Sequence, residues 1–266
     1  MKTEIVVTGY GVVSPIGNSI VDFEKRMFDG ESGVIDIRGS LVPNTFPVPF
    51  GAVIDDSGIP SSETLGLEPG THSDGGRYLL FALQQLLDTL PASVVIDGIV
   101  HATPAGIFFE IVHDSLQHYS PDAFLWDELR AEWIVEIIAN RLKERGNGLI
   151  VPENIISINT ACAAGSNAIG LAYQMIRSGR MRRCLVCAVD AGAWESQLMN
   201  FHLLHTLTTE NVPASKASRP FSKSRAGFVK GEAAAVLLLE SEAAAEERQA
   251  EILCRVSGYS FTSDAY

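Results

Sequence analysis

Five short runs of mostly apolar residues limit the folds open to this chain more than any other feature of its sequence. They lie at 4–13, 94–102, 154–159, 184–191 and 233–241. Runs that are apolar at consecutive positions, and not only at alternate ones, are typical of strands buried on both faces. Because a sheet covered on both faces needs helices on both sides, the runs predict a layered α/β fold.

Helical patterns fill the intervals between these runs. Residues 77–90 and 121–146 place apolar side chains three and four positions apart, and Gly146 closes the second pattern. The alternation predicts a mostly parallel sheet. Residues 38–76 are rich in Pro, Gly and Ser and predict a surface excursion. Residues 205–225 are polar and turn-rich, so they form either the wall of a site or an ordinary exposed connection.

The length and charge of the chain narrow its possible partners. Its 266 residues fit one large domain or two small ones, and a net charge of -12 argues against binding to nucleic acids or anionic membranes. Four arginines lie close together in the sequence. This cluster is more typical of the solvated C-terminal end of a helix than of a docking patch. Residues 1–13 do not resemble a targeting leader, and no apolar run is long enough to cross a bilayer, which predicts a cytoplasmic protein. The arginines are Arg177, Arg180, Arg182 and Arg183.

The four cysteines do not indicate a disulfide scaffold, because they are few and three of them lie in or beside strand-like runs. Cys184 and Cys187 form a C-x-x-C pattern, but no second cysteine or histidine pair follows at zinc-site spacing. Buried strand positions are therefore favoured over a metal or redox role. Cys162 differs, because it lies where the run at 154–159 ends and the next helix begins.

The position of Cys162 favours a nucleophile. At the start of a helix, unpaired backbone N–H groups and the helix dipole stabilise an anion, and the thiolate is the reactive form of cysteine. The same N–H groups can hold the oxygen of a tetrahedral intermediate, and the small neighbours Ala161 and Ala163 leave room for a substrate. The alternative is a packing cysteine. His101 is the best local candidate for a base, although a structural histidine is favoured there.

Five segments, taken in order, resemble the β-ketoacyl synthases, the condensing enzymes of fatty-acid and polyketide assembly. They are "IVVTGYGVVSPIGN", "FEKRMFDGESGVIDI", "NTACAAGSNAIG", "HTLTTENVPASKASRPFSKSRAGFVKGEAAAVLLLE" and "GYSFTSDAY". The resemblance implies a thiolase-like fold, in which two related α/β halves stack as five αβαβα layers. Residues 1–266 correspond to the N-terminal half, which bears the nucleophile, and the family acts as a dimer.

The resemblance also implies a reaction. Cys162 accepts an acyl group from the phosphopantetheine thiol of an acyl carrier protein, and the acyl-enzyme then undergoes a decarboxylative Claisen condensation with a malonyl carrier. No metal or dissociable cofactor is needed, since phosphopantetheine arrives on the carrier. The family's two catalytic histidines and a supporting lysine belong to the C-terminal half. We therefore expect either a complementing C-terminal-half polypeptide, with a dimer of such pairs, or a truncated or processed product. The complementing polypeptide is favoured, because residue 266 falls near the midpoint of the family's fold.

Further site residues follow from the resemblance. Phe201 matches an aromatic residue often found beside the cysteine, and Pro104 lies near the position that gates the acyl pocket. Ala161 and Ala163 flank the nucleophile and are expected to contact substrate. Glu232 fits the family's buried structural acid and receives a supporting role.

Two other functions stay open at this point. A cysteine-dependent acyltransferase that never condenses would use Cys162 without the decarboxylating residues. A non-catalytic partner, comparable to the chain-length-controlling subunits of ketosynthases, would need no nucleophile. The presence of Cys162 speaks against this second alternative, because those subunits generally lack the cysteine.

Overall fold

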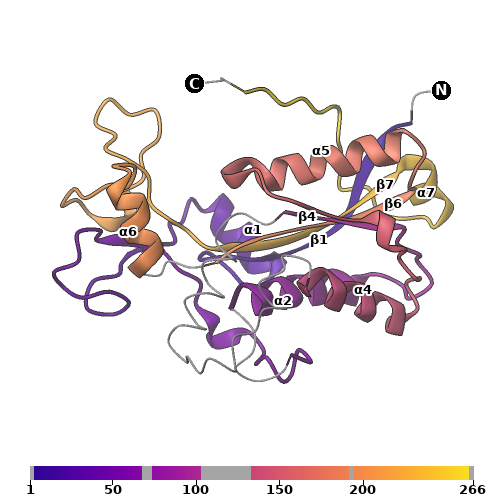
Figure 1. Cartoon of the computed structure of the whole chain (residues 1–266), viewed down its shortest axis with the longest axis horizontal. Helices are drawn as coiled ribbons and strands as arrows, with labels where there is room; N and C mark the ends of the chain where they lie inside the picture. Colours follow the sequence, from indigo (N-terminus) through magenta and orange to yellow (C-terminus); the bar gives the residue numbers. More distant parts are fainter. Residues whose placement is uncertain (1–2, 68–73, 103–132, 192–194, 264–266) are drawn as a thin grey trace.

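A six-stranded sheet forms the centre of the molecule in the computed structural model, which describes residues 3–67, 74–102, 133–191 and 195–263. Figure 1 shows this sheet nearly edge-on, and the order of its strands is β5-β4-β6-β7-β1-β8. All five predicted strands are present, and β8 is an additional short strand at one edge. The strands are β1 (Ile5–Val13), β4 (Gly98–Ala102), β5 (Ile155–Ile158), β6 (Arg183–Asp190), β7 (Ala233–Ser241) and β8 (Cys254–Arg255).

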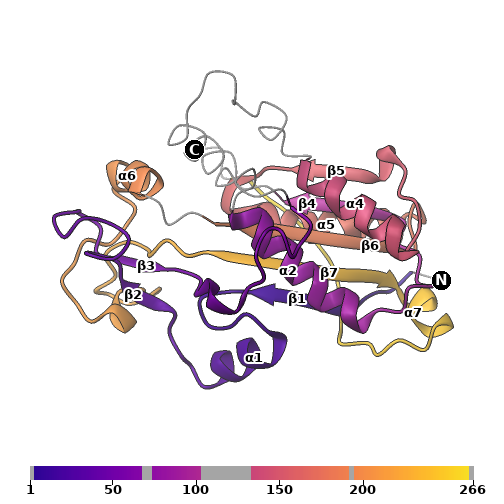
Figure 2. The same cartoon turned by 90° about the horizontal axis from the view of Figure 1, so that it is seen from below.

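The sheet is mixed, so the prediction of a mostly parallel sheet was wrong. Strand β4 runs parallel to β5 and β6, whereas β7 lies antiparallel between β6 and β1 (Figure 2). The reason lies in the connection between β6 and β7. Asp190 at the end of β6 pairs with Ala233 at the start of β7, so the long connection returns to the edge that it left. Continuous apolar runs report burial on both faces and carry no information on strand direction.

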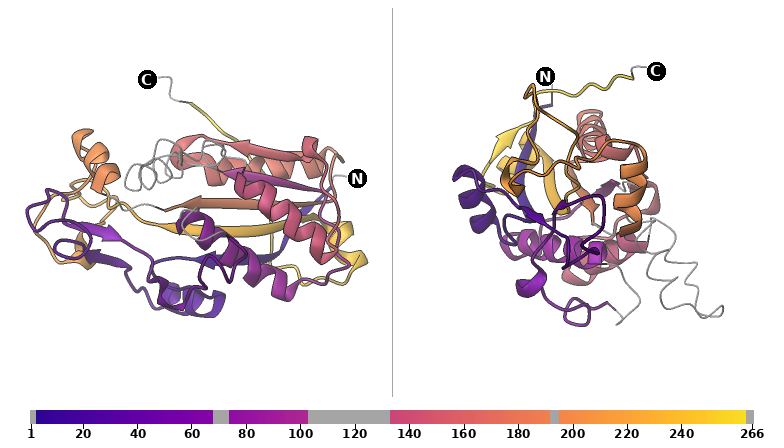
Figure 3. Two further views of the ribbon diagram at one scale, coloured as in Figure 1. Left: turned by 60° about the horizontal axis from the view of Figure 1, so that its bottom comes forward. Right: turned by 90° about the vertical axis from the view of Figure 1, so that its left-hand side faces the viewer.

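Helices cover both faces of the sheet. Helices α2 (Asp74–Thr89) and α4 (Trp133–Arg145) pack on one face, and α5 (Ala164–Arg177) packs on the other (Figure 3). The helix predicted at 77–90 is confirmed as α2. The pattern at 121–146 is confirmed over the extent of α4, while its first part, up to residue 132, lies outside the described residues. These layers confirm the predicted α/β class.

Helix α5 begins directly after the turn that holds Cys162, and it ends where its sequence predicts. Gly179, at a φ of +78°, takes the left-handed conformation that closes many helices, and its N–H donates to the carbonyl of Ile176 at 3.0 Å. Ala168, Ala172 and Tyr173 on its inner face are buried against the sheet. Packing of this face, more than helix propensity, stabilises α5.

Over residues 38–67, the predicted surface excursion is only partly exposed. The short strand β2 (Val34–Asp36), just before this region, pairs with β3 (Phe50–Ala52) inside it and forms a second sheet. Apolar side chains of the region then enter two separate clusters. Val42, Phe46 and Val48 are buried with Leu198 and Leu207, and Ile54, Ile59, Leu65 and Leu67 join the main core. Isolated apolar residues between Pro and Gly have no periodicity, so their burial was not visible in the sequence.

The described residues also form three shorter α-helices. They are α1 (Ile20–Phe28), α6 (Glu195–Leu203) and α7 (Glu242–Glu247). The segment at 205–225 contains one 3-10 turn, Ala214–Lys216, and no strand. Among the described residues, no helix combines the length and the apolar character needed to cross a membrane.

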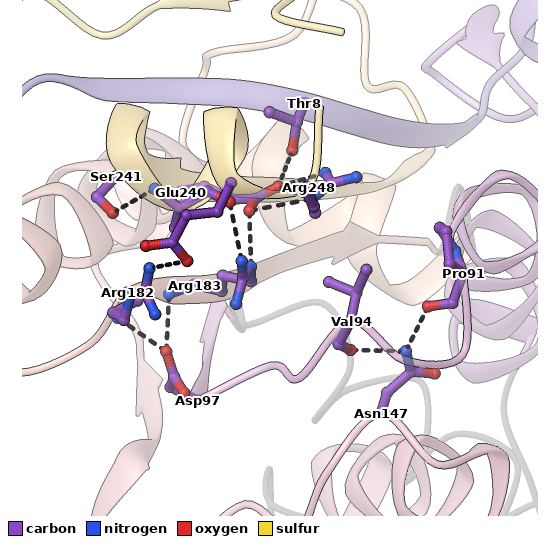
Figure 4. A network of polar contacts seen from close by, with 12 residues as sticks. Thr8, Pro91, Val94, Asp97, Asn147, Arg182, Arg183, Glu240, Ser241 and Arg248 are labelled. Carbon is purple, nitrogen blue, oxygen red and sulfur yellow. Dashed lines mark hydrogen bonds and ion pairs between the residues drawn. The ribbon is translucent and has the colours of Figure 1, made fainter. Parts of the chain in front are cut away.

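A buried ion-pair network joins β7 to β6 and to the segment after α7. The carboxylate of Glu240, which is fully buried, accepts hydrogen bonds from Thr8 at 2.5 Å, from Nε of Arg183 at 2.7 Å and from Nε of Arg248 at 3.0 Å (Figure 4). Burial acts to raise the pKa of Glu240, but the hydrogen bonds from Arg248, Thr8 and Arg183 outweigh it and lower that pKa. Arg183 thus belongs to β6 and to this network, which corrects its interpretation as part of a solvated helix end.

Candidate active site

Cys162 lies in a tight turn between β5 and α5, where the sequence predicts it, and its side chain is exposed. Ala161, just before it, has a φ of +50°, which residues with a Cβ rarely adopt and which costs on the order of 1–2 kcal/mol. The N–H of Ala161 donates to Oδ1 of Asn159 at 3.1 Å and so helps to hold this conformation. The strained turn presents Cys162 ahead of α5.

A chain of side-chain hydrogen bonds braces the turn from the other side. Nδ2 of Asn167 donates to Oγ1 of Thr160 at 2.7 Å, and the hydroxyl of Tyr259 donates to Oδ1 of Asn167 at 2.8 Å. The ring of Tyr259 lies against Gly170, where a Cβ would overlap it. The segment near the end of the chain is thereby attached to the first turns of α5. No pattern in the sequence indicates this contact, because Asn167 and Gly170 resemble other small or polar residues of the helix.

Cys162 borders a pocket of about 210 Å³. The pocket lies where β4 and β6 end and β7 begins, on the sheet face that α5 covers. Most of its lining side chains are alanines, so the space beside the thiol is open and apolar. Besides Cys162, the lining residues that matter here are Ala102, Ala188, Ala233 and Ala235 from the sheet, Ala161 from the turn, and Asp190 from the end of β6.

Among the described residues that line this pocket, Asp190 is the only charged one. Its Oδ2 lies 2.7 Å from Nζ of Lys230, whose side chain is only 7% exposed, whereas the side chain of Asp190 is 40% exposed. An ammonium group this deeply buried needs a carboxylate partner, because leaving it unpaired is strongly unfavourable. The ion pair was not predicted from the sequence. Two features could have indicated it: a polar residue at the end of a buried strand and a lone lysine in "FVKGE".

Glu232 fastens the segment around Lys230 to the end of β3. Its Oε2 accepts from the N–H of Ile54 at 3.0 Å, and its own N–H donates to the carbonyl of Ala52 at 2.9 Å. The N–H of Ala52 in turn donates to the carbonyl of Lys230 at 2.9 Å. Glu232 is buried and is not among the residues that line the pocket of Cys162. Its supporting role in catalysis stays a prediction.

His101 faces away from Cys162. It lies in β4 between Val100 and Ala102, which both pack on the side of α5. Because successive side chains of a strand point to opposite faces, His101 points to the side of α2 and α4. It is fully buried there. A direct role as the base of Cys162 is therefore excluded by geometry, and the structural interpretation holds.

The other predicted site residues are distributed unevenly around the cysteine. Ala161 lines the pocket, while Ala163 is exposed and is not among the lining residues. Phe201 belongs to α6, and its ring packs edge-to-face on Phe228 with the centroids 5.7 Å apart, away from the pocket lining. Pro104 lies outside the described residues. The substrate-binding roles of these four residues stay predictions.

Cys184 and Cys187 occupy β6 and point to opposite faces of the sheet. Burial raises the pKa of the Cys184 thiol to about 12 and raises that of Cys187 as well. Thiols on opposite faces cannot bind one metal ion. Within the described ranges, no group of three or more His, Cys, Asp or Glu side chains is placed to hold a metal.

These features define a class of protein. The chain has a thiolase-like α/β fold, in which helices cover both faces of a mixed sheet and an exposed cysteine occupies a strained turn between a strand and a helix. Comparisons with known sequences then show which family the chain resembles. Residues 138–245 match the family described as "Beta-ketoacyl synthase, N-terminal domain". The chain is thus similar to the N-terminal part of the β-ketoacyl synthases.

Curated relatives carry matching names. The chain is 29% identical over 273 residues to "3-oxoacyl-[acyl-carrier-protein] synthase 2" of Vibrio harveyi, with all of this chain and 64% of that protein covered. It is 27% identical to "Putative polyketide beta-ketoacyl synthase 1" of Streptomyces halstedii, of which it covers 65%. The chain thus spans about two thirds of the length of these relatives.

Solved structures show the same fold. A type II PKS acyl-carrier protein in complex with its ketosynthase bound to the hexaketide matches with a TM-score of 0.80 at 23% identity, covering all of this chain and 64% of the matched one. The ishigamide ketosynthase/chain length factor matches with a TM-score of 0.76 at 24% identity, covering all of this chain and 65% of the matched one. At these identities the likeness concerns the fold alone.

Proposed function

We propose that the chain is the cysteine-bearing part of a β-ketoacyl-[acyl carrier protein] synthase of fatty-acid or polyketide biosynthesis. The observation that carries the proposal is the exposed thiol of Cys162 at the mouth of an alanine-lined pocket, in a chain that resembles this family. The names of the relatives, which include acyl-carrier-protein synthases and polyketide synthases, support the substrate class.

Acylation of Cys162 is the first step of the proposed reaction. The sulfur attacks the thioester carbonyl of the acyl carrier protein, a new carbon–sulfur bond forms, and the bond to the carrier sulfur breaks. The proton of Cys162 ends on the departing carrier thiol. Backbone N–H groups at the start of α5 are suited to hold the intermediate oxyanion, because no side chain caps this helix end.

Condensation needs groups that are not among the described residues of the Cys162 pocket. No histidine is among the described residues that line it, and His101 faces the opposite side of the sheet. In this proposal the decarboxylating residues lie outside residues 1–266, on a complementing C-terminal-half polypeptide, and the pairs associate as dimers. Acyl and malonyl carriers are the partners, and phosphopantetheine enters only on them.

Acyl transfer to Cys162 tests the proposal directly. The purified chain is incubated with an acyl-loaded carrier protein, with and without the complementing polypeptide, and intact-mass spectrometry follows the added acyl group. We expect one acyl group per chain, no acylation of Cys162→Ala, and wild-type acylation of the matched control Cys254→Ala. Full acylation of Cys162→Ala would show that another residue accepts the acyl group and would overturn the proposal.

A cysteine-dependent acyltransferase without condensation is the second candidate. No histidine is found among the lining residues that the structure describes, and this favours it. The two functions differ in their products, since only condensation lengthens the acyl chain by two carbons. Analysis of the products formed with malonyl carrier and the complementing polypeptide present therefore separates them. Transfer of the unextended acyl group to water or an alcohol would favour the second candidate.

A further inference from the structure

The ion pair of Asp190 and Lys230 places one charged group on an otherwise small and apolar pocket. Asp190 ends β6 on the face that α5 covers, because it is in phase with Cys184, Val186 and Ala188. It therefore shares its side of the sheet with Cys162. Apart from Cys162, the other described lining residues are alanine, glycine and valine, whose side chains offer no hydrogen-bond acceptor to a molecule in the pocket.

Lys230 fixes the orientation of the Asp190 carboxylate. The Lys230 side chain is almost fully buried, and its Nζ lies 2.7 Å from Oδ2 of Asp190. Its backbone is also held, because the Lys230 carbonyl accepts from Ala52. A salt bridge between exposed side chains exchanges partners easily, whereas a buried ammonium group keeps its single carboxylate partner. Lys230 thus acts through Asp190, as a positioning residue.

The carboxylate retains capacity to accept further hydrogen bonds. Oδ1 is buried and has no hydrogen-bond partner among the described residues, although the side chain as a whole is 40% exposed. A carboxylate oxygen can accept more than one hydrogen bond, and Lys230 accounts for one. An acceptor of this kind makes stronger hydrogen bonds than a neutral carbonyl does.

We infer that Asp190, oriented by Lys230, is a specificity-determining residue that accepts a hydrogen bond from an N–H or O–H group of the molecule that reaches Cys162. The inference rests on the proposed function where it identifies that molecule as an acyl thioester. The donor is then either a hydroxyl group on the acyl chain or an amide N–H of the thiol arm. The pocket favours thioesters with such a donor over those without one.

Alkylation of Cys162 tests the inference without any acyl transfer. Iodoacetamide carries N–H donors, whereas N,N-dimethyl-iodoacetamide has none, and both form the same carbon–sulfur bond with loss of iodide. Cys254, which is exposed on β8, serves as the internal reference for intrinsic probe reactivity. Peptide mapping gives the rate ratio of Cys162 to Cys254 for each probe. We expect this ratio to be about tenfold higher for iodoacetamide, which is the effect of one hydrogen bond to a charged group.

The variant Asp190→Ala/Lys230→Met should abolish this preference, since it removes both charges together and leaves no unpaired ammonium group. Asp36→Asn, which breaks the exposed pair with Arg38, is the matched control and should keep it. Asp190→Asn serves as a second variant if the double variant does not fold, and it should weaken the preference. Equal preferences in wild type and in the folded Asp190 variant would overturn the inference.

Thioesters then identify the donor. The probes are the butanoyl and 3-hydroxybutanoyl thioesters of N-acetylcysteamine and the butanoyl thioester of ethanethiol. Faster acylation by the hydroxyacyl probe points to the acyl chain, and slower acylation by the ethanethiol ester points to the thiol arm. If none of the three acylates Cys162 while the alkylation preference depends on Asp190, the proposed function fails and the donor-binding role of Asp190 stands.

Discussion

At the scale of single residues, the four cysteines differ in their expected reactivity. Cys162 and Cys254 are exposed, whereas Cys184 and Cys187 are buried on opposite faces of β6. Only the thiolate reacts rapidly with electrophiles, and a buried thiol with a raised pKa is protonated at neutral pH. The two buried cysteines therefore serve packing, which agrees with their position in an apolar strand.

We predict that iodoacetamide at neutral pH labels Cys162 and Cys254 in the folded chain and leaves Cys184 and Cys187 unmodified. Burial raises the pKa of Cys184 to about 12, so almost none of it is thiolate at neutral pH. Peptide mapping after a short reaction measures each site, and the unfolded chain, in which all four sites react, is the control. Rapid labelling of Cys187 in the folded chain would contradict this assignment. Labelling of Cys162 no faster than that of Cys254 would favour the non-catalytic partner.

Gly170 is a second residue with a specific consequence. Its missing side chain makes room for the ring of Tyr259, whose hydroxyl donates to Asn167. We predict that Gly170→Ala displaces Tyr259 and speeds proteolysis of the segment around residues 257–263, while the core keeps its stability. Limited proteolysis followed by mass spectrometry measures the cleavage rate. Gly165→Ala on the same helix is the control, because a Cβ there meets only Ala188, in ordinary van der Waals contact at 3.8 Å. Equal cleavage rates for the two variants would show that Tyr259 does not depend on Gly170.

At the scale of elements, the network around Glu240 ties β7 to β6. The pKa of Glu240 is lowered in the folded state, so its contribution to stability is fully present above the pKa of an unfolded glutamate and is lost as the pH falls through the folded value. Glu240→Gln leaves Arg183 and Arg248 without their buried carboxylate. We therefore predict a loss of about 3–5 kcal/mol in the free energy of unfolding at pH 7.

The loss should shrink in acid, because the protonated wild-type side chain then resembles glutamine. Urea unfolding at pH 7 and near pH 3.5 measures the difference. Glu247→Gln, which removes an exposed pair with Arg182, is the control and should change stability little. If Glu240→Gln is as stable as wild type at pH 7, the network makes no net contribution to the free energy of unfolding.

Elements differ in how far the sequence anticipates them. Long local patterns of apolar residues predict strands β1, β6 and β7 and helix α2. The antiparallel direction of β7 depends on where a long connection returns, and no local pattern encodes that. The burial of Phe46 and Val48 depends on a neighbour, Leu198, that is remote in the sequence. Local periodicity therefore finds the elements, and tertiary contacts decide their direction and partners.

The whole molecule assembles its pocket from segments that are far apart in the chain. Ala102, Cys162, Asp190 and Ala233 meet where the strands of the sheet end or begin, which is the usual place for sites in α/β folds. The sequence identified Cys162 because a thiol at a strand–helix corner has a local chemical meaning. The pair of Asp190 and Lys230 could not be predicted from the sequence, because the two side chains meet only when β6 and the segment before β7 lie side by side in the fold.

The last prediction concerns the reaction of the chain as a whole. Among the described residues that line the pocket, there is no histidine or other group suited to polarise a malonyl thioester for decarboxylation, apart from a carboxylate that Lys230 already holds. We therefore predict that the 266-residue chain, once acylated on Cys162, releases no carbon dioxide from malonyl carrier protein. Adding a polypeptide that contains the C-terminal part of a ketosynthase of this family should start the release and yield a chain longer by two carbons. Isotope-labelled malonyl carrier and product mass spectrometry measure both events, with Cys162→Ala as the control for extension. Decarboxylation by the chain alone would place the required groups within residues 1–266 and would show that the pocket of Cys162 is complete without a partner.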